Sequence, residues 1–207
     1  QDLYTLTSEV IINLKPILEE FNPDYLFVHG DTTTAMAASI AGFYFGSQIC
    51  HVEAGLRTFN LKSPFPEEMN RSVIGVTSNI HFVPTTIASQ NLIKENKLKD
   101  NIIITGNTVI DALLYSVKKI KSNYIDNEIE SLKEIIDLNQ KIILVTAHRR
   151  ENHGNGFINI CKALKKIVKE NKDCQIIFPV HLNPKVQKIV YKHLINISNI
   201  KLIKPLS

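Results

Sequence analysis

Short apolar runs rich in β-branched residues alternate with longer amphipathic segments along the whole chain. Helices are expected between short strands, which we place at residues 25–28, 48–52, 80–83, 101–105, 141–146, 175–180 and 200–203. Strands separated by helices at this spacing are typical of an α/β fold with parallel strands. Helix-start signals agree, since Thr85 and Thr86 can cap a helix that runs to about Asn96, and Asn183 precedes a proline suited to the first helical position. We therefore predict an α/β protein with parallel sheets.

The composition is that of an ordinary globular protein, because 44% of the 207 residues are hydrophobic. The net charge of +4 is small and evenly spread, so it does not indicate a nucleic-acid partner. The densest basic run, residues 162–172, places lysines at helical spacing opposite Ile160, Leu164 and Val168, which is typical of a solvated helix face. No apolar stretch reaches the ~18 residues of a membrane span and no secretory signal opens the chain. We expect no membrane partner and a cytoplasmic location.

The three cysteines are predicted to be core thiols. Cys50, Cys161 and Cys174 are odd in number, widely spaced and placed in apolar segments, so they indicate neither a disulfide framework nor a zinc site. No spacing of His, Cys and Asp makes a convincing metal site. Four of the seven histidines are interpreted as structural: His51, His81, His153 and His193.

Two domains are expected. Residues 122–140 form a polar stretch with a weak helical pattern, so we place a boundary near residue 125 and predict Rossmann-like domains at residues 1–125 and 126–207. The chain opens on a helix-like segment, residues 6–21, and stops just after the last predicted strand. Because a parallel sheet needs cover on both faces, we expect exposed apolar surface and interpret the chain as part of a longer protein.

Acidic residues follow the predicted strands. Asp31 and Glu53 each come after a buried run, and Glu67-Glu68 opens a later helix. In an open parallel sheet the binding crevice lies outside the carboxyl ends of the strands, so acids placed there tend to converge. Thr32 begins a run of three threonines, and hydroxyls with free N–H groups at a helix start can hold an anion or a sugar hydroxyl. These residues predict an acid-lined site.

Structural roles for the same acids stay open at this point. Asp31 and a threonine can simply cap the following helix. Glu53 can pair with Arg57 in a surface loop. Glu67 and Glu68 can serve only the helix dipole, because both fall in the first turn.

Basic residues follow two later strands. His148, Arg149 and Arg150 precede a glycine-containing loop, and such a cluster suits a phosphate, since arginine binds it bidentately and histidine can donate a proton to a leaving oxygen. A salt-bridged surface loop is the alternative. His181 follows the run at residues 176–180, where a functional histidine and a buried, satisfied one are equally compatible with the sequence.

Six tracts occur in the order and approximate spacing of one family: HGDTTT, HVEAGLRT, PFPEEMNR, TGNTVIDAL, TAHRREN and PVHLNP. From about Pro23 to Pro184 the chain resembles the non-hydrolysing UDP-N-acetylglucosamine 2-epimerases of bacteria and archaea. The resemblance implies two Rossmann-like domains of the GT-B type and an isomerase that uses neither metal nor nicotinamide. The reaction it implies interconverts UDP-N-acetylglucosamine and UDP-N-acetylmannosamine, through UDP elimination to 2-acetamidoglucal and re-addition of UDP. It also implies a homodimer that binds UDP and UDP-N-acetylglucosamine and serves polysaccharide biosynthesis.

The resemblance assigns roles residue by residue. The family's functional acids fall on Asp31, Glu53 and Glu67, and its functional histidine on His148. Thr32 and Arg149 are expected to bind substrate, with His148 and Arg149 receiving the departing phosphate. The contacts of a second, regulatory UDP-N-acetylglucosamine site map onto Glu67, Arg149 and His181.

Other functions stay open. A hydrolysing epimerase would release free N-acetylmannosamine, but the TTT and AGLRT residues after the acids favour the non-hydrolysing branch. A nucleotide-sugar-binding module without catalysis is a second alternative. The family's N-terminal Gly-Thr-Arg-Pro-Glu tract and its later Ser-Gly-Gly segment are not in this sequence, so we expect these 207 residues alone to be inactive.

Overall fold

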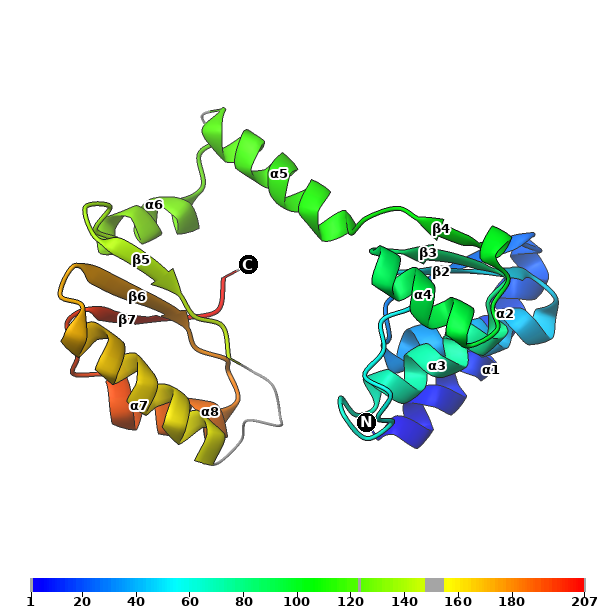
Figure 1. The fold of residues 1–207 in the computed structure, drawn as a ribbon, viewed down its shortest axis with the longest axis horizontal. Coiled ribbons are helices and arrows are strands. Elements are labelled where there is room, and N and C mark those ends of the chain that lie inside the picture. Colours follow the sequence, from blue (N-terminus) through cyan, green and yellow to red (C-terminus); the bar gives the residue numbers. More distant parts are fainter. Residues whose placement is uncertain (1, 123, 148–154, 207) are drawn as a thin grey trace. The chain divides into compact units, whose positions relative to one another are not determined.

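The computed structural model describes residues 2–122, 124–147 and 155–206 (Figure 1). The first elements in chain order are α1 (Leu3–Phe21), β1 (Tyr25–His29), α2 (Thr33–Phe45), β2 (Gln48–Val52), α3 (Glu67–Thr77), β3 (Ile80–Val83), α4 (Thr86–Lys94), a 3₁₀ turn (Lys99–Asn101), β4 (Ile102–Ile104) and α5 (Thr108–Lys121). The later elements are α6 (Asn127–Ile135), β5 (Lys141–Leu144), α7 (Asn155–Glu170), β6 (Cys174–Pro179), α8 (Pro184–Leu194) and β7 (Ile200–Ile203). The predicted strands are confirmed within two residues of their expected bounds, and both sheets are parallel.

The chain divides into two compact units, Gln1–Val117 and Lys118–Ser207. The division falls within α5, whereas the sequence pattern placed it after that helix, near residue 125. All residues of α5 are exposed, including Leu113 and Leu114 at 62% each. Because α5 contributes nothing to either core, packing does not tie it to one unit.

The first unit is a four-stranded parallel sheet in the order β1-β2-β3-β4. Ile49 of β2 pairs with Leu26 of β1, and alternate residues of a strand share a face. Ile49 and Val28 therefore lie together on the side covered by α2 and α3. Helix α4 packs on the same face, where Leu92 contacts Val83 of β3. Figure 1 shows these helices on one side of the sheet, and α1 packs against α2 beyond them. The hydrophobic clusters of the first unit thus lie on this one side of its sheet.

The opposite face of this sheet carries exposed apolar side chains. Tyr25, Phe27 and Ile103 are 56%, 61% and 45% exposed, and Phe27 stacks on Phe82 with ring centroids 6.0 Å apart. Parallel sheets normally bury both faces. The first unit thus leaves apolar surface exposed, as the sequence led us to expect.

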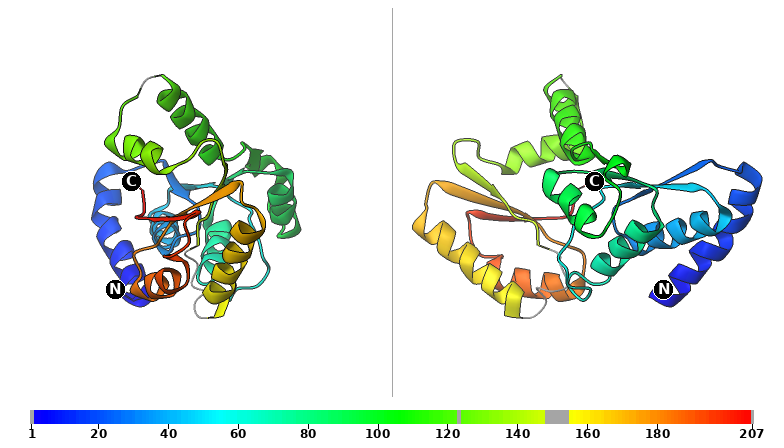
Figure 2. Two further views of the ribbon diagram at one scale, coloured as in Figure 1. Left: turned by 90° about the vertical axis from the view of Figure 1, so that its left-hand side faces the viewer. Right: turned by 45° about the vertical axis from the view of Figure 1, so that its right-hand side comes forward.

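The second unit is a three-stranded parallel sheet in the order β5-β6-β7, with α7 and α8 against one face (Figures 1 and 2). Its core joins Phe157 and Leu164 of α7 to Phe178 of β6 and Val190 of α8. The lysines of α7 lie on the opposite side of that helix, at exposed positions, so the predicted solvated helix face is confirmed.

Side-chain caps begin several helices at the predicted positions. Thr85 Oγ1 accepts the Ala88 N–H at 3.1 Å, and Asn183 Oδ1 accepts the Lys185 N–H at 3.0 Å. The three cysteines are buried free thiols, as predicted, and burial raises the pKa of Cys50 and of Cys161. None of the helices in the described residues combines the length and the apolarity that a membrane crossing requires.

Candidate functional site

The turn after β1 presents Asp31. Gly30 makes this turn with a φ of +73°, which favours glycine. Helix α2 then begins at a different side chain, because Thr32 Oγ1 accepts the Ala35 N–H at 3.1 Å. The Asp31 carboxylate instead lies toward α3, where its Oδ2 is 3.3 Å from Nη2 of Arg71. The interpretation of Asp31 as only a helix cap is therefore wrong, and the cap belongs to Thr32.

Glu53 follows β2 in a strained conformation. Its φ of +65° lies in the left-handed region that non-glycine residues rarely occupy, and such strain collects at functional sites. Its Oε2 is 3.6 Å from Nε2 of His29, and its Oε1 accepts the Asn107 Nδ2 hydrogen at 3.4 Å. Arg57 is not its partner, since Arg57 binds Glu95 through two bonds of 2.6 and 2.8 Å. The alternative of a Glu53–Arg57 surface pair is thus wrong.

Glu67 and Glu68 open α3 but have different surroundings. The Glu68 side chain is 1% exposed, and its Oε1 accepts the N–H groups of Thr58 and Phe59 at 2.9 and 2.8 Å. Its Oε2 is 3.2 Å from Nε of Arg71. Glu68 therefore holds the loop before α3 and does more than complement the helix dipole. Glu67 is partly exposed on the adjoining position of the helix.

The three predicted acids of the first unit are brought together. Burial raises the pKa of the Asp31 carboxyl above its ordinary value, and the neighbouring carboxylates of Glu67 and Glu53 raise it further. The Arg71 guanidinium opposes these effects. Asp31 and Glu53 follow neighbouring parallel strands, and Glu67 begins the helix that packs beside them. The result is a carboxylate cluster at the carboxyl edge of the sheet, where ligands of α/β proteins bind.

Two buried histidines support this edge from within the sheet. His51 and His81 are cross-strand partners, and each is 1% exposed. His51 Nε2 lies 2.8 Å from the carbonyl oxygen of Gly30, in the turn that presents Asp31. Burial lowers the pKa of each imidazole from 6.5 to about 4, so both are neutral at pH 7. This placement fits the structural role predicted for both.

A family model described as UDP-N-acetylglucosamine 2-epimerase matches residues 1–207, the whole chain. The chain belongs to this epimerase family. A "UDP-N-acetylglucosamine 2-epimerase" of Campylobacter jejuni is 54% identical over 211 residues, an alignment that covers all of this chain and 55% of that protein. The chain thus spans about half the length of the curated relatives it matches.

Solved epimerase structures have the same fold as this epimerase chain. The UDP-GlcNAc 2-epimerase of Neisseria meningitidis, in a crystal structure described as bound to UDP-GlcNAc, matches with a TM-score of 0.94 and 46% identity, over 100% of this chain and 56% of that one. A Methanocaldococcus jannaschii UDP-GlcNAc 2-epimerase, in complex with UDP-GlcNAc and UDP, matches with a TM-score of 0.81 and 30% identity, over 97% and 55%. The predicted α/β fold of the GT-B type is confirmed by these likenesses.

The basic residues of the predicted site are only partly described. His148 and Arg149 lie outside the described residues of the epimerase chain, so their predicted roles stay predictions. His181 lies in the second unit between β6 and α8, and its Nδ1 accepts the Asn183 N–H at 3.1 Å. The histidine is exposed, which excludes the buried alternative. Among the described residues there is no group of three or more His, Cys, Asp and Glu side chains able to hold a metal ion.

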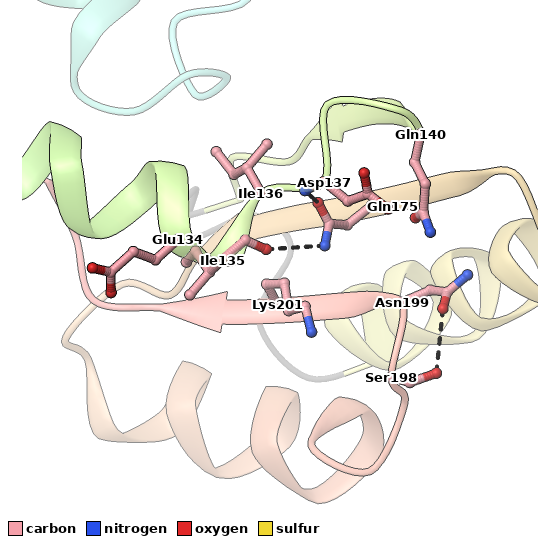
Figure 3. Close-up of a pocket in the computed structure, with 9 residues that line it drawn as sticks. All are labelled: Glu134, Ile135, Ile136, Asp137, Gln140, Gln175, Ser198, Asn199 and Lys201. Atoms are coloured by element: carbon pink, nitrogen blue, oxygen red, sulfur yellow. Dashed lines mark hydrogen bonds between the residues drawn. The ribbon is translucent and has the colours of Figure 1, made fainter.

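A polar hollow of about 310 Å³ lies elsewhere in the epimerase chain, on the second unit (Figure 3). Its walls are tied together by Gln175, which donates to the Ile135 carbonyl at 3.1 Å and accepts the Asp137 N–H at 3.0 Å. Ser198 and Asn199, which precede β7, place it at the amino ends of the strands. Ligands of parallel sheets bind at the opposite ends, so the hollow is not the predicted site.

Four residues near the acids were missed by the sequence reasoning: His29, Asn70, Arg71 and Asn107. Asn70 Nδ2 donates to the Asp31 carbonyl oxygen at 2.8 Å, although the two residues are 39 positions apart. A signal for Asn70 and Arg71 was present, because they follow Glu67 by three and four positions and so share its helix face. The pairing of Asn107 with Glu53 has no such local signal.

Proposed function

We propose that this chain supplies the catalytic acids of an enzyme that interconverts UDP-N-acetylglucosamine and UDP-N-acetylmannosamine. The observation that carries the proposal is the gathering of Asp31, Glu53 and Glu67 at one sheet edge, in a chain that the epimerase family model matches throughout. Because the chain spans about half the length of its curated relatives, the proposal concerns a protein of their full length.

The chemistry explains why several acids are needed. The proton on carbon 2 has no adjacent carbonyl to acidify it, so its removal must be coupled to departure of UDP from carbon 1. This elimination forms 2-acetamidoglucal, and UDP then adds back to carbon 1 while a proton returns to the other face of carbon 2. General acid or base action supplies ~10²- to 10⁴-fold, and one electrostatic contact another ~10²- to 10³-fold. The rate enhancement that a single group supplies is therefore too small for this reaction.

The proposal divides the work among the clustered residues. Asp31 and Glu53 exchange the proton on the two faces of carbon 2. Glu67 stabilises positive charge that grows on the ring, or orients a partner. The strained backbone of Glu53, together with His29 and Asn107 on its two carboxylate oxygens, supports a fixed position for this acid.

Other parts of the proposal rest on the family resemblance. His148 and Arg149 would receive the departing phosphate, Thr32 would contact the substrate, and a regulatory UDP-N-acetylglucosamine site would use Glu67, Arg149 and His181. The protein would act as a homodimer, in the cytoplasm, and supply a polysaccharide pathway. Crystal structures of relatives bound to UDP-GlcNAc, and to UDP-GlcNAc with UDP, support these ligands.

Replacing Glu53 with Gln tests the proposal. In a protein of full family length, Glu53→Gln is expected to slow the entry of solvent deuterium at carbon 2 by at least ~10²-fold, since one proton-transfer group is lost. Mass spectrometry of the nucleotide sugar measures the exchange. Glu19→Gln is the matched control, because Glu19 is exposed on α1, and it is expected to exchange at the parent rate. Equal exchange in the two variants would remove Glu53 from the mechanism.

Product analysis separates the competing functions. The proposal expects UDP-N-acetylmannosamine as the product, with UDP retained. Free N-acetylmannosamine as the main product would indicate the hydrolysing reaction. Tight UDP-N-acetylglucosamine binding without either product would indicate a binding module.

A further inference from the structure

Arg71 is a buried guanidinium between two carboxylates. Its side chain is 11% exposed, with Nη2 3.3 Å from Asp31 Oδ2 and Nε 3.2 Å from Glu68 Oε2. The same Nε donates to the Glu67 carbonyl oxygen at 3.3 Å, one helical turn back along α3. A buried charge needs such partners. For Arg71 one partner is Glu68, which holds the loop before α3, and the other is Asp31 of the proposed catalytic cluster.

The Glu68 carboxylate is fixed by hydrogen bonds of its own. The other oxygen of Glu68 is occupied by the N–H groups of Thr58 and Phe59, so the Glu68 carboxylate has little freedom to move. Arg71 Nε is held by its hydrogen bond to the Glu67 carbonyl oxygen and by the charge of Glu68 Oε2 at 3.2 Å, and Nη2 faces Asp31. A fixed Glu68 therefore orients the guanidinium of Arg71 toward Asp31.

The backbone beneath Asp31 is fixed separately. Asn70, the residue before Arg71, donates from Nδ2 to the Asp31 carbonyl oxygen at 2.8 Å and lies 3.4 Å from Thr33 Oγ1. Consecutive residues of α3 thus act on different parts of Asp31. Asn70 fixes its backbone, whereas Arg71 contacts its carboxylate.

The charge of Arg71 matters because the other charged neighbours of Asp31 are acidic. Glu67 of α3 and Glu53 after β2 are the acidic neighbours, and Arg71 of α3 is the cation that counters them. His29, at the end of β1, lies against Glu53. Burial and the two carboxylates raise the Asp31 pKa, and Arg71 lowers it. Without Arg71, nothing among these neighbours would favour the ionised form of Asp31 except its backbone hydrogen bond.

We propose that Arg71 is a positioning residue that keeps the Asp31 carboxylate ionised and directed, so that Asp31 can accept a proton. The inference rests on the proposed function, because it requires Asp31 to transfer a proton during epimerisation. Arg71 itself contacts two protein carboxylates and is assigned no contact with substrate. Its effect passes through Asp31.

The pH profile of kcat/KM tests this role in a protein of full family length. On the low-pH side of the profile, called here the acidic limb, Arg71→Met is expected to move the midpoint to a higher pH by about 1 unit. The reason is that an opposite charge at this distance lowers a carboxyl pKa by about 1 to 3. At pH values below the parent midpoint kcat/KM should fall by as much as about 10-fold, and it should recover at higher pH. Arg71→Lys retains the charge and should return the limb to near the parent position.

A second variant is needed in case Arg71→Met does not fold. The double variant Arg71→Met with Glu68→Gln removes the buried carboxylate that the single variant leaves unpaired, so its limb can be read if the single variant does not fold. Arg57→Lys is the matched control, because Arg57 is a buried arginine paired with Glu95, outside the cluster. It should leave the limb in place.

Two results would overturn the inference, and they differ. An unshifted limb with activity lowered equally at every pH would show that Arg71 is only structural, while the proposed function stands. Parent-like turnover in Asp31→Asn would show that Asp31 transfers no proton, which removes the proposed role of Asp31 and this inference with it.

Discussion

Acid is expected to destabilise the first unit by about 3 kcal/mol for each of His51 and His81 as the pH falls from 6.5 to 4. Both imidazoles are buried neutral, and burial lowers each pKa from 6.5 to about 4. The unfolded chain takes up protons below pH 6.5, whereas the folded chain resists them until about pH 4. Stability from these groups is therefore complete above pH 6.5 and is lost as the pH falls toward 4.

Urea unfolding between pH 4 and 7, followed by circular dichroism because the chain has no tryptophan, measures this dependence. Carboxylates add to the slope, so the comparison is with His81→Leu, which removes one proton uptake. Its slope should be smaller by up to about 1.4 kcal/mol per pH unit. A parent slope in His81→Leu would contradict the neutral, buried state of His81.

These histidines also show what sequence can predict. Strand positions were predictable, because apolar runs of four to six residues bounded by turn signals have few other interpretations. The convergence of Asp31 and Glu53 was predictable from the geometry of parallel strands alone. That His51 and His81 would be buried as cross-strand partners required the register, which pairs residues 30 positions apart.

The ion-pair and hydrogen-bond partners within the site could not be predicted from residues that are close in sequence. A sequence-local interpretation pairs Glu53 with the nearby Arg57, but the fold gives Arg57 to Glu95, which is 38 positions away. The dipole interpretation of Glu68 failed for the same reason, because the Thr58–Phe59 loop folds back over the start of α3. Long-range packing decides which acid receives a partner and which remains near the cluster.

Gly55→Ala is expected to destabilise the first unit by about 3 kcal/mol. Gly55 has a φ of +83°, where an L side chain costs about 1 to 2 kcal/mol. A Cβ there would also lie 2.3 Å from the carbonyl oxygen of Ala88, which belongs to the rigid backbone of α4. Overpacking of this kind costs about 1 to 3 kcal/mol. The carbonyl oxygen of Gly55 itself accepts the Asn91 Nδ2 hydrogen at 3.0 Å, so the turn cannot shift without losing that bond.

Gly106→Ala separates the two costs. Its φ of +77° is nearly the same, but a Cβ there meets nothing within 4 Å, so only the backbone strain remains and about 1 kcal/mol is expected. Urea unfolding of both variants at pH 7.5 measures the difference. Equal losses would mean that α4 yields to the added methyl group, and then the close approach of α4 does not fix the turn that follows Glu53. A larger loss at Gly55 would show that this approach holds the segment carrying the acid.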